Sequence, residues 1–149
     1  MKAIRNLFSI AVVLTVVFAS GQAAAQIFPT ADITPDPLEF PDTRIGETAS
    51  AMSFTVTKTA GQLPVYIFST KVGDASNFTI SNDLCSQTAL QEVGDSCTVA
   101  VTFSPNSRGH FNTTFSVVSF SQEVIDTAIV EGDGVEPAVT LSASSIAFG

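Results

Sequence analysis

The chain has 149 residues, with 14 acidic and six basic side chains and a formal net charge of −8. An acidic surface repels phosphate groups, so this composition argues against nucleic acid and anionic membranes as partners. A chain of this length can bury one hydrophobic core but not two.

Residues 1–25 have the pattern of a secretory signal peptide. Lys2 and Arg5 precede an apolar run over residues 7–19, and residues 23–25 are alanines that suit signal peptidase. The run is shorter than the roughly 20 residues that span a bilayer. The sequence therefore predicts cleavage after residue 25 and export to the periplasm, the cell surface or the medium, with no membrane association afterwards. Four basic residues then remain against all 14 acidic ones.

Alternating side chains predict short strands over most of residues 26–134. In 52–57 and 97–103, every second residue is apolar and the residues between are mostly polar, as in strands with one buried face. Three further pairs are expected to point inward: Val65 with Ile67, Phe78 with Ile80, and Phe115 with Val117.

Residues 124–131 also read as extended, but their register stays open. Val124, Ala128 and Val130 compete with Ile125 and Ile129 for the core. Glycine and proline are expected to break the chain between strands, at Gly46, 61–64, 73–74, 94–95, 105–109 and 132–134.

Seven short strands in roughly 100 residues predict an all-β fold, a seven-stranded immunoglobulin-like β-sandwich. The antibody type is excluded because the chain has no Trp to pack on an inter-sheet disulfide. Phenylalanine is expected to fill the core instead.

Cys85 and Cys97 are the only cysteines. An isolated pair in an exported protein predicts one disulfide. The alternatives are a redox pair, which usually has Cys-x-x-Cys spacing, and zinc ligands, of which a structural site needs four. The two cysteines are too close in sequence to join strands B and F, so the bridge is expected to tie together the D–E connection.

A run of spaced residues leads from the cysteines to a glycine: Cys85, Leu90, Gly94, Ser96, Cys97, Val99, Val101, Phe103, Pro105 and Gly109. With the opening Leu38-Glu39-Phe40 and the closing Gly132-Asp133-Gly134, this run resembles the bacterial secreted members of the ASH (Abnormal spindle/Hydin-type) domain family, often labelled choice-of-anchor D proteins. The resemblance covers about residues 30–134. It implies a tandem β-sandwich architecture on or outside the cell surface, and it implies no active site.

Residues 135–149 begin to repeat the start of the domain. Three apolar residues recur after a shift of 108 positions: Ile33, Leu38 and Phe40 as Leu141, Ile146 and Phe148. The sequence therefore predicts a linker and the first strand of an incomplete second repeat, with further repeats of the same polypeptide expected. Alternatively, residues 137–149 form a strand that is donated to an exposed sheet edge of another subunit.

No catalytic constellation is recognisable. His110 is the only histidine, and nothing near it in sequence marks a nucleophile elbow or an oriented base. We expect a protein that is not an enzyme and needs no cofactor.

A calcium site is the alternative to the expectation that the chain binds no metal. Glu131, Asp133 and Glu136 place three carboxylates across the expected linker. Calcium takes six to eight oxygen ligands, and the spacing matches no EF-hand loop, so solvated acids are the simpler interpretation.

The leading hypothesis is a non-catalytic structural or protein-interaction module of a secreted or cell-surface bacterial protein. It would act as a spacer or adhesion unit and contact protein partners through strand edges or loops. No aromatic cluster in the sequence indicates where. A second hypothesis is a fibre-forming subunit that donates residues 137–149, and a third is an extracellular hydrolase built around His110.

Overall fold

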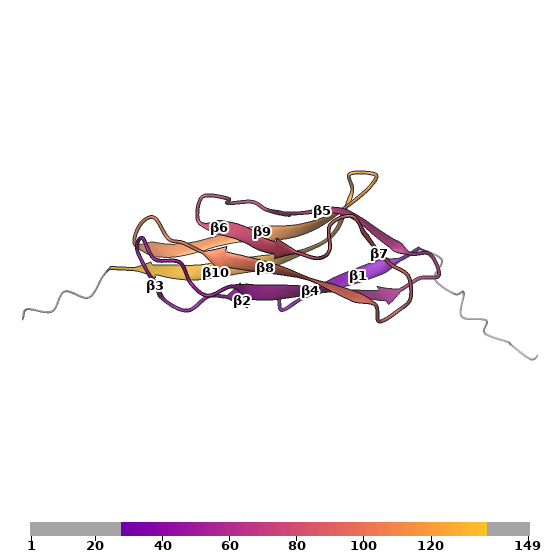
Figure 1. The fold of residues 1–149 in the computed structure, drawn as a ribbon, viewed down its shortest axis with the longest axis horizontal. Helices are drawn as coiled ribbons and strands as arrows, with labels where there is room; N and C mark the ends of the chain where they lie inside the picture. Colours follow the sequence, from indigo (N-terminus) through magenta and orange to yellow (C-terminus); the bar gives the residue numbers. More distant parts are fainter. Residues whose placement is uncertain (1–27, 137–149) are drawn as a thin grey trace, which may run out of the picture.

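Ten β-strands and no helix make up residues 28–136, the part of the chain that the computed structural model describes (Figure 1). Seven strands have five or more residues and correspond to the seven expected; the other three have two or three. In chain order the strands are β1 (Thr30–Thr34), β2 (Leu38–Glu39), β3 (Thr43–Arg44), β4 (Met52–Ala60), β5 (Val65–Val72), β6 (Phe78–Asp83), β7 (Thr88–Leu90), β8 (Ser96–Phe103), β9 (Gly109–Ser119) and β10 (Val124–Val135).

The strands form two sheets that face each other, which confirms the immunoglobulin-like sandwich. One sheet has the order β1-β4-β8-β6, and the other has the order β2-β10-β9-β5-β7, with β3 also pairing with β10. The first segment changes sheets, because β1 is antiparallel to β4 whereas β2 and β3 run parallel to β10. Among the described residues, no helix is long and apolar enough to cross a membrane.

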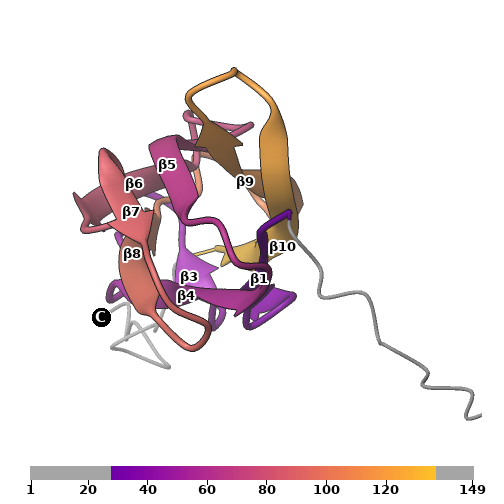
Figure 2. The same cartoon turned by 90° about the vertical axis from the view of Figure 1, so that its right-hand side faces the viewer.

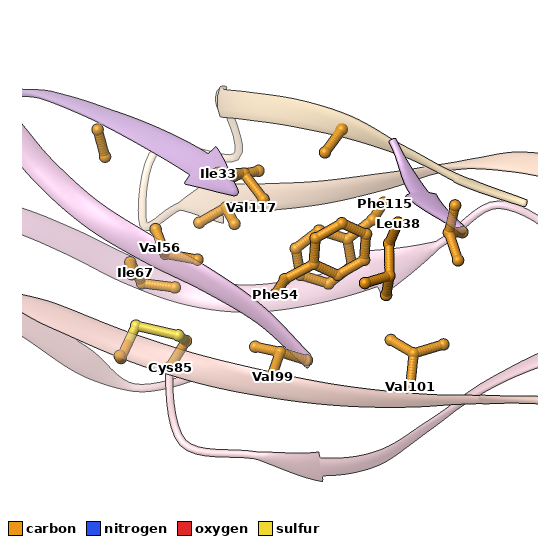
Figure 3. Packing of buried hydrophobic residues seen from close by; sticks show 14 of the residues in the cluster. Ile33, Leu38, Phe54, Val56, Ile67, Cys85, Val99, Val101, Phe115 and Val117 are labelled. Carbon is orange, nitrogen blue, oxygen red and sulfur yellow. A yellow bond between two sulfur atoms is a disulfide. The ribbon is translucent and has the colours of Figure 1, made fainter. Parts of the chain in front are cut away.

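Phenylalanine fills the core, as the composition indicated. Phe54 of β4 and Phe115 of β9 stack with ring centroids 4.4 Å apart between the two sheets (Figure 3). Phe78 and Phe103 stack at 4.9 Å, and Phe40 lies against both rings. The inward residues predicted for 52–57 and 97–103 point into this core; of these, only Met52 is partly exposed.

A β-bulge settles the register of β10. The pairing with β9 shifts between Val124 and Asp126, so that Ile125 and the later Ala128 and Val130 all pack toward the core. Val124 and Ile129 are exposed. Neither of the two competing sets was right as a whole, because the extra residue of a bulge reverses which side chains face inward.

The expectation of a chain break at residues 132–134 is wrong, because β10 continues to Val135. Gly132 lies inside this strand, and a Cβ there would come within 2.9 Å of two carbons of the Phe103 ring. At Gly134, a Cβ would lie 2.3 Å from the carbonyl oxygen of Ser107. These glycines are needed for close packing rather than for a turn.

The expected disulfide joins Cys85, in the connection that follows β6, to Cys97 of β8, with Cα atoms 5.2 Å apart. It therefore ties the connection between β6 and β8, which correspond to strands D and E, as predicted. Asp83 organises the same connection: its carboxylate accepts hydrogen bonds from the amides of Cys85 and Ser86 and from the hydroxyls of Ser86 and Thr70.

Burial alone would raise the pKa of the Asp83 carboxyl, but these hydrogen bonds outweigh it and hold the pKa below its usual value.

The expected leader, residues 1–25, and the apolar segment 137–149 lie outside the described residues.

Candidate functional site

The two ends of the sandwich differ in chemistry. At one end, which we call the β1 pole, β1 and β5 begin and the β9–β10 hairpin projects (Figure 2). The opposite end, where β10 finishes beside β3, is called the β3 pole. The β1 pole contains a hollow of about 650 Å³ with more apolar than polar lining, which we call the β1 groove.

Large apolar side chains stand exposed around the β1 groove. Those that line it are Phe28, Tyr66, Phe120 and Val124, with exposed fractions of 77%, 54%, 55% and 57%. Phe68 lies next to them, with its ring edge-on to that of Phe120 at a centroid distance of 5.3 Å. Contiguous apolar surface of this kind marks binding sites more often than scattered single residues do.

Strand geometry explains why two of these aromatics point outward. Val65 and Ile67 of β5 face the core, and successive side chains of a strand point to opposite faces, so Tyr66 and Phe68 face away from it. The sequence pattern did not predict the aromatic cluster, whose members come from three separate segments: the residues before β1, β5 and the β9–β10 connection.

Gly61 holds the N-terminal wall of the groove in place. Its φ of +89° is one that L side chains rarely adopt, and a Cβ there would lie 2.3 Å from the carbonyl oxygen of Phe28. The segment that carries Phe28 can therefore lie directly against the β4–β5 turn only because residue 61 is glycine.

An unpaired strand edge runs along the groove. β1 is the edge strand of its sheet, and residues 30–32 line the hollow. Farther along β1, the amide of Ile33 donates a hydrogen bond to Asp126 of β10 at 2.9 Å. The amide of Ile129 in turn donates to Asp36 at 2.8 Å. The two carboxylates close the space between β1 and β10 beyond the groove. Within the groove, no strand of residues 28–136 pairs with the outer edge of β1.

The charged side chains that line the groove are acidic. Asp32 and Glu123 contribute to the wall, and no lysine or arginine of the described residues does. Lys58 of the neighbouring strand β4 does not line the groove. It is only 1% exposed, and its ammonium group donates a hydrogen bond to the carbonyl of Gln91 at 2.5 Å on the core side of β4. The groove therefore favours a neutral or basic apolar ligand over an acidic one.

The histidine lies elsewhere, on the outer surface near the β3 pole. His110 Nδ1 lies 3.2 Å from a carboxylate oxygen of Asp133, and Nε2 lies 3.7 Å from one of Glu131. Both contacts are with carboxylates, and within residues 28–136 no hydroxyl or thiol forms a hydrogen bond to this ring. The arrangement lacks the nucleophile that the hydrolase hypothesis needs.

The three carboxylates considered for calcium do not converge. Glu131 and Asp133 lie on β10 and face His110, whereas Glu136 is directed at Arg108, 3.9 Å away. In the described part of the chain, no group of three or more potential ligands could hold a metal ion. The calcium alternative also placed Glu131 and Asp133 in a linker, whereas residues 131–135 belong to β10.

No protein-family model matches this chain, and neither does any curated protein sequence. Among solved structures it is similar to the ASH/PapD-like domain of human CEP192 (PapD-like domain 7), at 18% identity and a TM-score of 0.51. The match covers 87% of this chain and 99% of that one. This likeness shows the fold alone, and it agrees with the ASH-type sandwich that the sequence resembles.

Two bacterial proteins share the fold. The secreted serine protease VesC from Vibrio cholerae is 16% identical with a TM-score of 0.55, over 74% of this chain and 24% of that one. A protein of unknown function from Porphyromonas gingivalis W83 is also 16% identical, with a TM-score of 0.52, over 76% of this chain and 50% of that one. The chain thus spans about a quarter of VesC and half of the second protein.

Proposed function

We propose that this chain is a non-catalytic protein-interaction module of an exported bacterial protein, of the secreted ASH or choice-of-anchor D type, and that it binds protein through the β1 groove. One observation carries the proposal: exposed aromatic side chains surround a hollow that runs along an unpaired strand edge. Such a site offers apolar contact area together with main-chain hydrogen bonds, the two components of strand-addition binding.

Export is part of the proposal. The leader pattern of residues 1–25 supports it, and so does the disulfide between Cys85 and Cys97, because such bridges persist in oxidising compartments. The chain continues beyond Val135, where β10 ends beside β3. The module then contacts other proteins at its β1 pole while the next part of the chain leaves from its β3 pole.

The test compares complexes formed by the exported chain in its source organism. We expect the native chain to elute from a size-exclusion column in a complex larger than a monomer of the exported chain. The double variant Tyr66→Ser/Phe120→Ser should elute as a monomer, because it removes two aromatic walls of the groove. A matched control, Leu84→Ser/Val93→Ser, removes two equally exposed apolar side chains outside the groove and should keep the complex. A groove variant that keeps the complex would rule the proposal out.

A further inference from the structure

We propose that the β1 groove binds Ile146 and Phe148 of a second copy of this chain, so that copies join head to tail. The inference rests on the proposed function of the groove and names its occupant. Three observations lead to it: what the segment resembles, where it leaves the domain, and its lack of charge.

Residues 141–148 copy a segment that this domain buries. Their counterparts, Ile33, Leu38 and Phe40, are 5%, 2% and 6% exposed, because they are held in the core by pairing with β4 and β10. A segment with similar apolar residues at the same spacing is therefore suited to a sheet edge with an apolar floor. The groove offers both, since no strand in the described part of the chain pairs with the outer side of β1.

The segment leaves from the wrong end to occupy its own groove. β10 runs from the β1 pole at Val124 to the β3 pole at Val135, a length of roughly 37 Å for 12 residues (Figure 1). Ile146 follows Val135 by 11 residues, which reach about 40 Å when fully extended. Running back along the whole domain would leave no residues for the reversal, so the groove that Ile146 can fill belongs to another copy.

Charge favours this occupant over an acidic partner. The chain has a formal net charge of −8, and the groove wall carries Asp32 and Glu123 without a basic residue. Residues 137–149 contain no charged side chain, so their side chains are not repelled by the acidic residues of this wall. Their one aromatic residue, Phe148, matches the aromatic lining, because aromatic rings pack favourably edge-on or offset.

The proposed contact joins two different surfaces, so it produces a head-to-tail assembly rather than a closed dimer. The segment that is donated leaves from the β3 pole and the groove that accepts it is at the β1 pole, so an assembly keeps a free segment at one end and a free groove at the other. Head-to-tail contacts of this type extend until they close into a ring or continue as a filament.

Tyr66 provides a direct probe, since it is the only tyrosine, the chain has no tryptophan, and it lines the groove. The purified, exported variant Ile146→Ser/Phe148→Ser is titrated with a synthetic peptide of residues 137–149, and Tyr66 fluorescence is recorded. We expect a saturable change. The same peptide with Phe148→Ser should bind at least about tenfold more weakly, because it loses a buried aromatic ring. A peptide with Val139→Ser/Leu141→Ser should bind like the unmodified one.

Sedimentation of the purified full chain provides the second measurement. The native chain should form species whose mass increases with concentration, and Ile146→Ser/Phe148→Ser should remain monomeric at all concentrations. No peptide binding together with a monomeric native chain would overturn the inference, as would assembly that depends on Val139 and Leu141 instead. The proposed function would survive that result if Tyr66→Ser/Phe120→Ser still abolished a complex with a different protein in the source organism. If no groove-dependent complex forms with any protein, both fail.

Discussion

The carboxylate of Asp126 on β10 accepts a hydrogen bond from the main-chain amide of Ile33 on β1, at 2.9 Å. A second bond runs the other way, from the amide of Ile129 on β10 to Asp36, which follows β1. Each bond joins residues 93 positions apart and satisfies a main-chain amide of one strand with a side chain from a distant part of the sequence. Together they limit the open edge of β1 to the part that lines the groove.

Removing one of these carboxylates should lengthen the open edge. We expect Asp126→Ala to lower the free energy of unfolding by about 1 kcal/mol, the typical cost of one such hydrogen bond. It should also accelerate hydrogen exchange of the Ile33 amide. Asp42→Ala, at an exposed position, should change stability by less than about 0.5 kcal/mol. Unchanged exchange at Ile33 in the Asp126 variant would show that the carboxylate does not protect this edge.

The disulfide should stabilise the domain mainly by restricting the unfolded chain. We expect Cys85→Ala/Cys97→Ala to lower the free energy of unfolding by about 3 kcal/mol, the chain-entropy value for a loop of this length. Urea denaturation measures the difference. The unsubstituted chain in the reduced state is the control, because it loses the bridge without a change in side chains. Equal stability of the oxidised and reduced chains would contradict the prediction.

Gly132 should resist even the smallest substitution. In Gly132→Ala the new Cβ would meet the Phe103 ring at 2.8 Å and Cβ of Phe40 at 3.0 Å, so we expect a loss of about 2 kcal/mol from overpacking. Asp133→Ala is the neighbouring control: its side chain is about half exposed, and its loss should cost less than about 0.5 kcal/mol. Thermal denaturation of both variants tests the pair. A Gly132 variant as stable as the control would mean that β10 is not seated on these rings.

Asp83 should make stability depend on pH in acid. Its pKa is lowered in the fold, so the folded state favours the ionised form, and the stabilisation is complete above the ordinary value of about 3.9. It is lost as the pH falls through the lowered pKa. The native chain should therefore be more stable than Asp83→Asn at pH 7, and this difference should shrink as the pH falls from about 5 to below 3. A difference that stays constant over this range would assign the effect to something other than ionisation.

Much of the fold could be predicted from the sequence because alternation is a local signal. The inward positions of 97–103 follow from their spacing alone, and the structure buries them as expected. The register of β10 could not be predicted in this way. It depends on a bulge opposite Val117 and Val118 of β9, and a bulge has no reliable signature within the strand that contains it.

The glycines at 132 and 134 led to the wrong prediction of a chain break for a related reason. A local pattern does not distinguish a glycine needed for a turn from one needed for close packing, and the ring that excludes a side chain at Gly132 belongs to Phe103, far away in the sequence. The groove could be predicted only in part from the sequence. Once Val65 and Ile67 are assigned inward, Tyr66 and Phe68 must face outward. Their proximity to Phe28 and Phe120 follows only from the folded arrangement.

Site-specific photo-crosslinking tests the central claim, that the β1 groove is the protein-binding surface. A photoreactive phenylalanine analogue placed at position 66 or 120 should give a discrete crosslinked protein band when the exported chain is irradiated in its source organism. The same analogue at position 84 or 93, which are as exposed but lie outside the groove, should give none. Crosslinks at positions 84 and 93 without any at positions 66 and 120 would contradict the account.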